Sequence, residues 1–228
     1  MIAFRHIDTW VFDLDNTLYP ASCRLFDQID VKMGEFVSRA LGMSYADAKK
    51  RQKELFYKHG TTLRGMMQEH GLKPEGFLEY VHNIDYSSIA ADAVLAREIE
   101  KLPGRKLVFT AGTVAHATRA MDRLGVTHLF DDIYDIVHAD YVPKPQRAPY
   151  DGFLKAHNVN PKRSAFFEDI ARNLEVPHAL GMVTVLVKSA DNRDANHLNE
   201  GSDGPHVHHV TEHLAGFLSD VNKSGRIK

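Results

Sequence analysis

The stretch Thr9–Pro20, TWVFDLDNTLYP, combines an apolar run with two closely spaced carboxylates. The run Trp10 to Phe12 indicates a strand that enters a hydrophobic core. Alternate side chains of an extended chain point the same way, so Asp13 and Asp15 lie on one side of it, with their Cα atoms roughly 6–7 Å apart. Two like charges at the mouth of a core require a cation or shifted pKa values. The stretch therefore predicts a core strand that delivers two carboxylates to one site.

The second half of the chain alternates short apolar segments with helical patterns of about ten residues. The expected strands are Lys106–Gly112, Asp131–Val137, Ser164–Asp169 and Met182–Val187, and the helices between them are Val114–Gly125, Ala148–Asn158 and Ala171–Gly181. This alternation is typical of βαβ units, which build a parallel sheet with helices on both faces. With Thr9–Phe12 as the first strand, the sequence predicts an α/β fold.

Residues 21–90 show helical spacing throughout. Four helices are expected, and the stops between them are Gly42, Gly60 and Gly71. Ser44 with Asp47 resembles a capping box at the start of the second helix. Roughly ninety residues separate the first strand from the next, which is far longer than an ordinary loop. We therefore expect an α/β core domain made of residues 1–20 and 91–228, and an all-helical domain at 21–90 inserted in it.

The C-terminal region begins with a polar segment, 191–205, which we interpret as a loop. Val207 and Val210 are expected in a last short strand, and Thr211 is expected to cap a final helix. Four histidines gather here, at positions 206, 208, 209 and 213. Because the other ten are scattered along the chain, we interpret these four as decoration of an edge strand rather than a metal cluster.

Composition and charge exclude several classes of function. The 228 residues contain 28 Lys and Arg against 30 Asp and Glu, with no long run of one sign, which argues against a nucleic-acid polymer as partner. Cys23 is the single cysteine, so an internal disulfide is excluded and a reducing compartment is favoured. No segment approaches the ~20 apolar residues of a membrane span. We expect a soluble cytoplasmic protein without a membrane partner; its oligomeric state is not readable from the sequence.

The ends of the predicted strands carry polar residues. In chain order these are Asp13 and Asp15, Thr110, Lys144 in the loop after the third strand, and Glu168 with Asp169. In open α/β sheets ligands bind outside the carboxyl ends of the strands, so these residues converge. Carboxylates suit Mg²⁺, a lysine and a threonine suit a phosphoryl group, and one carboxylate can act as nucleophile.

Each of these residues also has an ordinary structural explanation. A threonine at a strand end commonly caps a helix, a lysine before proline commonly lies in a solvated turn, and an adjacent Glu-Asp pair is commonly on the surface. Their joint occurrence in this order favours a common site.

Four segments, DLDNTLYP, FTAG, PKP and FFEDIARNL, resemble the signature motifs of the haloacid dehalogenase-like phosphohydrolases. Three more, KHGTTLRGMM, YVHNIDY and LPGRKLVFTAGTVAHATRAMDRLG, resemble the pyrimidine 5′-nucleotidase branch of that superfamily. The resemblance covers nearly the whole chain. It implies a Rossmann-like core and a helical cap that closes over a Mg²⁺-dependent phosphatase site.

The resemblance also implies roles for the acidic residues. Asp13 is the nucleophile that takes the phosphoryl group. Asp15 protonates the leaving oxygen and then deprotonates the attacking water. The metal ligands are Asp13, the backbone carbonyl of Asp15, and Asp169, with Glu168 acting directly or through water. Because dehalogenases of the family lack an acid at the position of Asp15, its presence favours a phosphatase.

Further residues are implied to bind the substrate. Thr110, the backbone N–H of Ala111, and Lys144 bind the phosphoryl oxygens, and Lys144 also restrains Asp13. In the cap, Arg64 or Thr62 contacts the substrate. Tyr57, His59 and His82 are interpreted as structural.

The implied substrate is a small phosphorylated metabolite. A pyrimidine nucleoside monophosphate is the first expectation, and pyridoxal phosphate is an alternative. Two non-enzyme alternatives are a receiver-like phospho-acceptor domain and a substrate-binding pseudo-enzyme. The second is motivated by departures from the family pattern, since Ala111 and Ile170 replace a usual Asn and Ser. Asn173 likewise stands where some members have a carboxylate.

Overall fold

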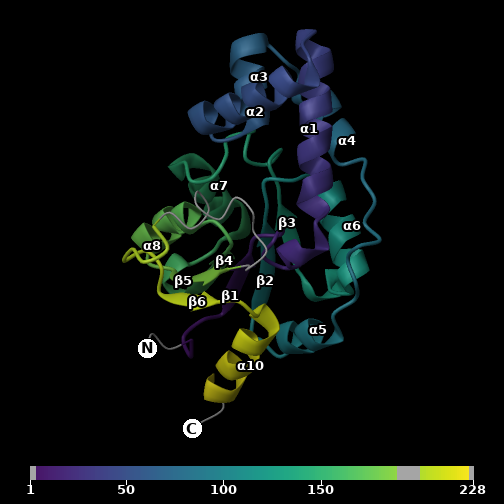
Figure 1. The fold of residues 1–228 in the computed structure, drawn as a ribbon. Coiled ribbons are helices and arrows are strands. Elements are labelled where there is room, and N and C mark those ends of the chain that lie inside the picture. Colours follow the sequence, from purple (N-terminus) through teal and green to yellow (C-terminus); the bar gives the residue numbers. More distant parts are fainter. Residues whose placement is uncertain (1–3, 189–200, 226–228) are drawn as a thin grey trace.

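The computed structural model describes residues 4–188 and 201–225 and contains one six-stranded parallel sheet in the order β3-β2-β1-β4-β5-β6 (Figure 1). The strands are β1 (Thr9–Phe12), β2 (Arg105–Phe109), β3 (Asp132–Tyr134), β4 (Ser164–Glu168), β5 (Val183–Val187) and β6 (His209–Thr211). Every neighbouring pair is parallel. The predicted Rossmann-like α/β fold is confirmed.

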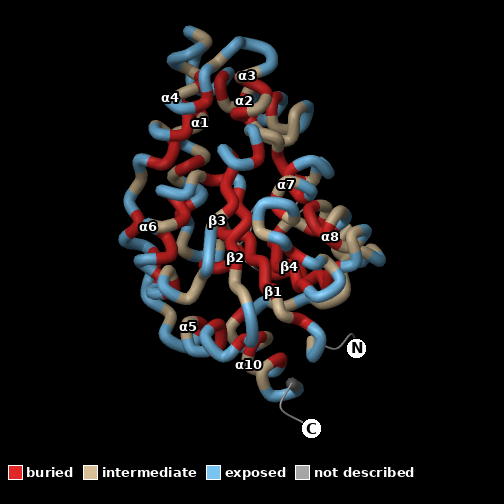
Figure 2. The backbone as a smooth tube through the Cα atoms, turned by 180° about the vertical axis from the view of Figure 1, so that it is seen from behind, coloured by how far each residue is buried: buried red, intermediate tan, exposed pale blue. Residues whose placement is uncertain are grey.

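The first strand lies at the centre of the sheet, between β2 and β4, and all four of its residues are buried. Its side chains alternate between the two faces of the sheet. Trp10 and Phe12 belong to a hydrophobic cluster on one face, and Val11 belongs to a cluster on the opposite face. The ring of Phe12 stacks on Phe167 of β4, with centroids 4.5 Å apart. Figure 2 shows the buried backbone concentrated along β1, β2 and β4. Burial on both faces explains why Trp10, Val11 and Phe12 follow one another without a polar residue between them.

Helices cover both faces of the sheet (Figure 1). The helices α5 (Ala93–Glu100), α6 (Val114–Leu124) and α10 (Leu214–Gly225) contribute to the cluster that contains Trp10. The helices α7 (Arg147–His157) and α8 (Glu175–Leu180) contribute to the cluster that contains Val11. We did not predict α5. Its sequence signal is Asp92, whose carboxylate accepts hydrogen bonds from the backbone N–H groups of Val94 and Leu95 at 3.0 and 2.8 Å.

Four further helices lie between β1 and β2 in the chain, at the end of the molecule opposite α10 (Figure 1). They are α1 (Leu25–Leu41), α2 (Tyr45–His59), α3 (Thr62–His70) and α4 (Pro74–Val81). Their apolar stripes pack into two clusters, which include Ile29, Leu63, Phe77 and Val81 in one and Val37, Ala48, Leu55 and Met66 in the other. The boundaries proposed for an inserted domain remain a prediction.

The caps of these helices follow the predicted signals. The Ser44 hydroxyl accepts a hydrogen bond from the backbone N–H of Asp47 at 3.2 Å, and Thr61 caps α3 in the same way. Gly42 ends α1 with φ of +64°, a left-handed conformation that glycine adopts without strain.

Three predictions of strand limits are wrong. The strand β2 ends at Phe109 rather than Gly112, and beyond it the Thr110 hydroxyl accepts a hydrogen bond from the backbone N–H of Gly112. The strand β3 ends at Tyr134 rather than Val137, because the Asp135 carboxylate accepts hydrogen bonds from the backbone N–H groups of Val137 and His138 and turns the chain. Near the C-terminus, Val207 precedes β6 and Thr211 is its last residue, while α10 begins at Leu214.

The remaining expectations for the C-terminal region have mixed outcomes. Positions 191–200 of the predicted loop lie outside the described residues. Within the described ranges, the four C-terminal histidines belong to no group of candidate metal ligands. Every helix within residues 4–188 and 201–225 is too short or too polar to cross a bilayer. The cytoplasmic location remains a prediction.

Candidate active site

Three residues from different strand ends meet at Lys144. Its ammonium nitrogen lies 2.7 Å from Asp13 Oδ1, 2.6 Å from Glu168 Oε2 and 3.2 Å from the carbonyl oxygen of Phe109. All three charged side chains are buried, with 8% or less of each residue exposed. A buried ion pair of this kind requires close partners, because each charge has lost its water. The topology therefore brings Asp13, Lys144 and Glu168 together, as expected from their positions at one edge of the sheet.

Asp169 completes an acidic group at this edge. One carboxylate oxygen each from Asp13, Glu168 and Asp169 lies within 4.8 Å of the others. Burial, reinforced by repulsion from Glu168, raises the pKa of Asp13 to about 7 and raises the pKa of Asp169 well above its usual range. One buried ammonium faces three carboxylates, so negative charge is left uncompensated. A hard divalent cation bound by oxygen ligands would relieve it, and the donor set fits Mg²⁺.

Thr110 and Ala111 follow β2 on the same edge. Thr110 is 1% exposed, its backbone N–H donates to the Tyr134 carbonyl at 3.0 Å, and its hydroxyl accepts from the backbone N–H of Gly112 at 2.9 Å. Ala111 is exposed. Gly112 has no room for a side chain, since a Cβ there would lie 2.7 Å from His116. The loop is thus fixed tightly against α6, while the phosphate contacts of Thr110 and Ala111 remain predictions.

The Asp15 carboxylate lies in a separate hydrogen-bonded group. Its Oδ1 accepts from the hydroxyl of Tyr19 and lies 2.9 Å from Nε2 of His116 on α6. Burial opposes ionisation of Asp15, but His116 and Tyr19 outweigh it and hold the pKa of this carboxyl below its usual range. Sequence reasoning missed His116 because it belongs to none of the four motifs and its partner is 101 residues away.

His82 lies behind His116. The two rings stack with centroids 4.4 Å apart, and burial, together with the neighbouring His116, lowers the pKa of His82 to about 3. Its Nδ1 lies 3.3 Å from the hydroxyl of Thr113. His82 therefore packs against His116, and the structural role expected of it remains a prediction.

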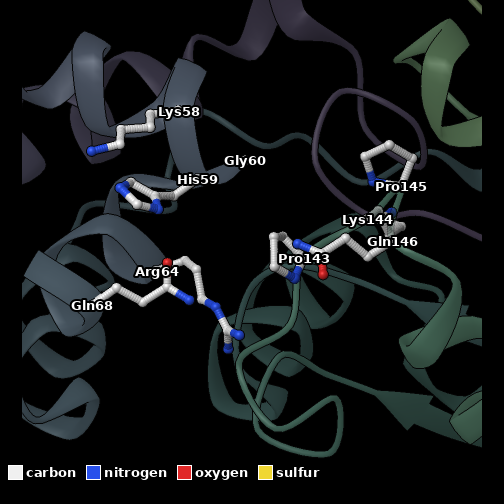
Figure 3. Close-up of a pocket in the computed structure, with 9 residues that line it drawn as sticks. All are labelled: Lys58, His59, Gly60, Arg64, Gln68, Pro143, Lys144, Pro145 and Gln146. Carbon is white, nitrogen blue, oxygen red and sulfur yellow. The ribbon is translucent and has the colours of Figure 1, made fainter.

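A pocket of about 290 Å³ separates α2 and α3 from the loop that carries Lys144 (Figure 3). Its lining residues are Lys58, His59, Gly60, Arg64, Gln68, Pro143, Lys144, Pro145 and Gln146. Of the three basic side chains in this lining, Lys58 pairs with Glu69, and Lys144 pairs with Asp13 and Glu168. Arg64 makes no ion pair within the described residues, so it is the lining group that favours an anionic occupant.

The two predicted cap residues, Arg64 and Thr62, have different surroundings in the structure. Arg64 lines this pocket, and its Nη1 lies 3.5 Å from the Tyr141 carbonyl. Thr62 does not line it: the residue is 4% exposed, and its hydroxyl donates to the Gln52 carbonyl at 3.4 Å. The substrate contact assigned to either residue remains a prediction, and the geometry is open to it only at Arg64.

The departures from the family pattern lie beside the acidic group. The backbone N–H of Ile170 donates to Glu168 Oε1 at 3.3 Å, so this position helps to hold Glu168 through its backbone. Asn173 is buried, and its side-chain oxygen has no hydrogen-bond partner among the described residues.

Cys23 is half-buried, and burial raises the pKa of its thiol, as expected for an unreactive cysteine.

Comparisons with known proteins identify the family and the fold. The family model of the haloacid dehalogenase-like hydrolases matches residues 7–181. Phosphate metabolism protein 8 of Saccharomyces cerevisiae is 24% identical over 193 residues, which is 77% of this chain. The chain spans 60% of the length of that relative.

Two solved structures illustrate the likeness of fold. A HAD phosphatase from Thermococcus onnurineus superimposes with a TM-score of 0.60 at 15% identity, covering 94% of this chain and 98% of that one. An L-2-haloacid dehalogenase from Xanthobacter autotrophicus gives a TM-score of 0.57 at 16% identity, with the same two coverages. At these identities the likeness shows a shared fold, which both a phosphatase and a dehalogenase adopt.

Proposed function

This chain belongs to the haloacid dehalogenase-like hydrolase family, and we propose that it hydrolyses phosphate monoesters. The observation that carries the proposal is Asp15, whose side chain lies two residues after the buried Asp13 and keeps 18% of its surface exposed. An ester oxygen needs a proton as it leaves, and a positioned carboxyl group supplies one. A departing halide needs none, so this residue favours phosphoryl chemistry over carbon–halogen cleavage.

The proposed reaction has two displacements at phosphorus. A carboxylate oxygen of Asp13 attacks, the bond to the ester oxygen breaks, and the leaving alcohol takes a proton from Asp15. Asp15 must enter this step protonated, although His116 and Tyr19 lower its pKa in the protein without substrate. Asp15 then takes a proton from water as the water oxygen attacks the aspartyl phosphate. This step releases inorganic phosphate and restores the Asp13 carboxylate. Lys144 holds Asp13 in place through its 2.7 Å contact and places positive charge beside the transferring group.

The residues for Mg²⁺ are Asp13, Glu168, Asp169 and the backbone carbonyl of Asp15. When bound there, the cation would supply positive charge against the phosphoryl oxygens. Among residues 4–188 and 201–225, Lys144 is the one cation that contacts both Asp13 and Glu168, and it stays protonated because these two carboxylates outweigh its burial and raise its pKa.

Removal of divalent metal is expected to abolish phosphate release, and added Mg²⁺ is expected to restore it. Added Mg²⁺ should also raise the unfolding temperature of the metal-free protein, because it relieves repulsion among three buried carboxylates. The second readout does not require substrate. Phosphatase activity that persists in full after exhaustive chelation would contradict the metal assignment.

We further propose a small phosphorylated metabolite as substrate, with residues 21–90 acting as the cap. A pyrimidine nucleoside monophosphate is favoured by the sequence resemblance, and pyridoxal phosphate is the competitor. The pocket beside Lys144 has the size of such a ligand, and Arg64 in its lining supports an anionic group there. Phosphate release from UMP, CMP, pyridoxal phosphate and an aryl phosphate, compared by kcat/KM, tests the proposal. No turnover of any of them would overturn it.

Replacement of Arg64 by alanine is expected to raise KM for the best substrate by about 10-fold or more, with a smaller change in kcat. The reason is that Arg64 lines the pocket, while its one described side-chain hydrogen bond goes to the Tyr141 carbonyl rather than to Asp13 or Asp15. Arg39→Ala is the matched control, since Arg39 is an exposed arginine on α1 that does not line the pocket. An unchanged KM in Arg64→Ala would show that the substrate does not reach this side of the pocket.

A further inference from the structure

The two oxygens of the Asp15 carboxylate have different surroundings. Both hydrogen bonds to this side chain fall on Oδ1, one from the Tyr19 hydroxyl and one from Nε2 of His116. No described residue donates a hydrogen bond to Oδ2, and this oxygen is accessible to solvent. A carboxylate only accepts hydrogen bonds, so Nε2 is the donor when Asp15 is ionised.

This difference between the two oxygens determines which of them carries the proton when Asp15 is protonated. Two donors aimed at Oδ1 make it the carbonyl-like oxygen, because an O–H on Oδ1 would face two other hydrogens. The proton then lies on Oδ2, the oxygen that is open to a ligand. The same geometry suits the ionised form, in which Oδ2 is free to accept a proton from water.

The ring of His116 is fixed on every side. The residue is 1% exposed, its Nδ1 lies 2.9 Å from the Tyr86 hydroxyl, and His82 stacks on its face. Gly112 approaches so closely that an added Cβ would lie 2.7 Å from the ring. The Tyr86 hydroxyl also lies 3.1 Å from the His82 carbonyl, but its single proton can serve only one acceptor. Donated to Nδ1, this proton fixes the tautomer whose hydrogen is on Nε2, so that Nε2 donates to Asp15 in both forms of the carboxyl group. A side chain held this firmly can impose its orientation on Asp15 at little entropic cost.

We propose that His116, supported by Tyr86, is a positioning residue that pins Asp15 through Oδ1 and so presents Oδ2 as the proton-transferring oxygen. The proposal rests on the proposed phosphatase function. His116 does not touch the substrate in this account, and it acts only through Asp15. Its loss should therefore impair the steps that need acid or base and leave substrate binding in place.

The experiment measures single-turnover release of phenols from aryl phosphates whose leaving groups differ in pKa. In His116→Leu, the rate with the poorest leaving group is expected to fall by roughly 10- to 100-fold, with little change for the best one, so the dependence on leaving-group pKa steepens. His116→Gln keeps an amide N–H near the position of Nε2 and should recover most of the rate. Tyr86→Phe should show the same steepening to a smaller extent.

Controls separate positioning from general damage. Tyr134→Phe removes another tyrosine hydroxyl that donates to a backbone carbonyl, that of His138, and should leave the dependence on leaving group unchanged. In an Asp15→Asn background, His116→Leu should cause little further loss of rate, because a residue that acts through Asp15 has nothing left to position. Thermal unfolding identifies any variant that does not fold.

The outcomes distinguish the two proposals. If the wild type releases no phenol from any aryl phosphate, the phosphatase function fails. If the wild type is active but His116→Leu, His116→Gln and Tyr86→Phe all lower the rates equally for every leaving group, His116 is a packing residue and the inference is overturned. The inference would also be overturned if His116→Leu lowered the rate of the Asp15→Asn variant by the same factor as it lowers the rate of the wild type.

Discussion

Replacement of Asp13 by asparagine is expected to lower phosphate release by roughly 10⁴-fold or more on every substrate, because the amide is not a nucleophile. Asparagine has nearly the same shape as aspartate, so the hydrophobic contacts of β1 are retained. The change also removes one of three buried carboxylates that repel one another. We therefore expect a folded protein without activity, measured by release of inorganic phosphate from UMP, CMP and an aryl phosphate.

The matched control is Asp8→Asn. Asp8 precedes the same strand at its amino end, where it pairs with Arg163 in solvent, on the opposite edge of the sheet. Activity close to wild type is expected for this control. Activity in Asp13→Asn that remains within a few-fold of the wild type would exclude Asp13 as the nucleophile and with it the proposed mechanism.

Replacement of Asp15 by asparagine is expected to lower steady-state turnover by roughly 10²- to 10⁴-fold, the range of a lost general acid–base group. The two half-reactions should respond differently. An aryl phosphate with a good leaving group needs no proton in the first displacement, whereas the attacking water still needs a base in the second. Rapid mixing should therefore show a burst of about one phenolate per enzyme molecule, followed by slow turnover.

The comparison between substrates provides the internal control for this variant. UMP has a poor leaving group, so Asp15→Asn should release neither nucleoside nor phosphate rapidly from it. Equal loss of both half-reactions on all substrates, without a burst, would contradict a role for Asp15 in proton transfer and would indicate distortion of the site.

The meeting of Lys144 with the carboxylates of Asp13 and Glu168 could be predicted from the sequence because it relies on topology alone. In a parallel sheet the carboxyl ends of all strands lie on one edge, so residues that follow different strands meet without any knowledge of side-chain packing. The contacts of Lys144 with Asp13 and Glu168 are the direct consequence.

Other parts of the site depend on packing that no sequence pattern records. His116 lies one residue before the apolar Ala117 on the buried face of α6, and only the approach of Asp15, from a segment 101 residues away, gives it a polar partner. Thr62 and Arg64 are two residues apart, yet the turn of α3 sends one into the interior and the other to the pocket. The early end of β3 depends on hydrogen bonds from Asp135 to the backbone, which compete with the strand.

The most direct measurement is the mass of the peptide that contains residues 9–20, recovered after acid quench of Asp15→Asn during the burst with an aryl phosphate. The account predicts that this peptide carries one additional phosphoryl group on Asp13, in an amount equal to the phenolate released, and that the group is absent from Asp13→Asn. A burst of phenolate without a phosphorylated peptide, or with the phosphoryl group on a residue other than Asp13, would contradict it.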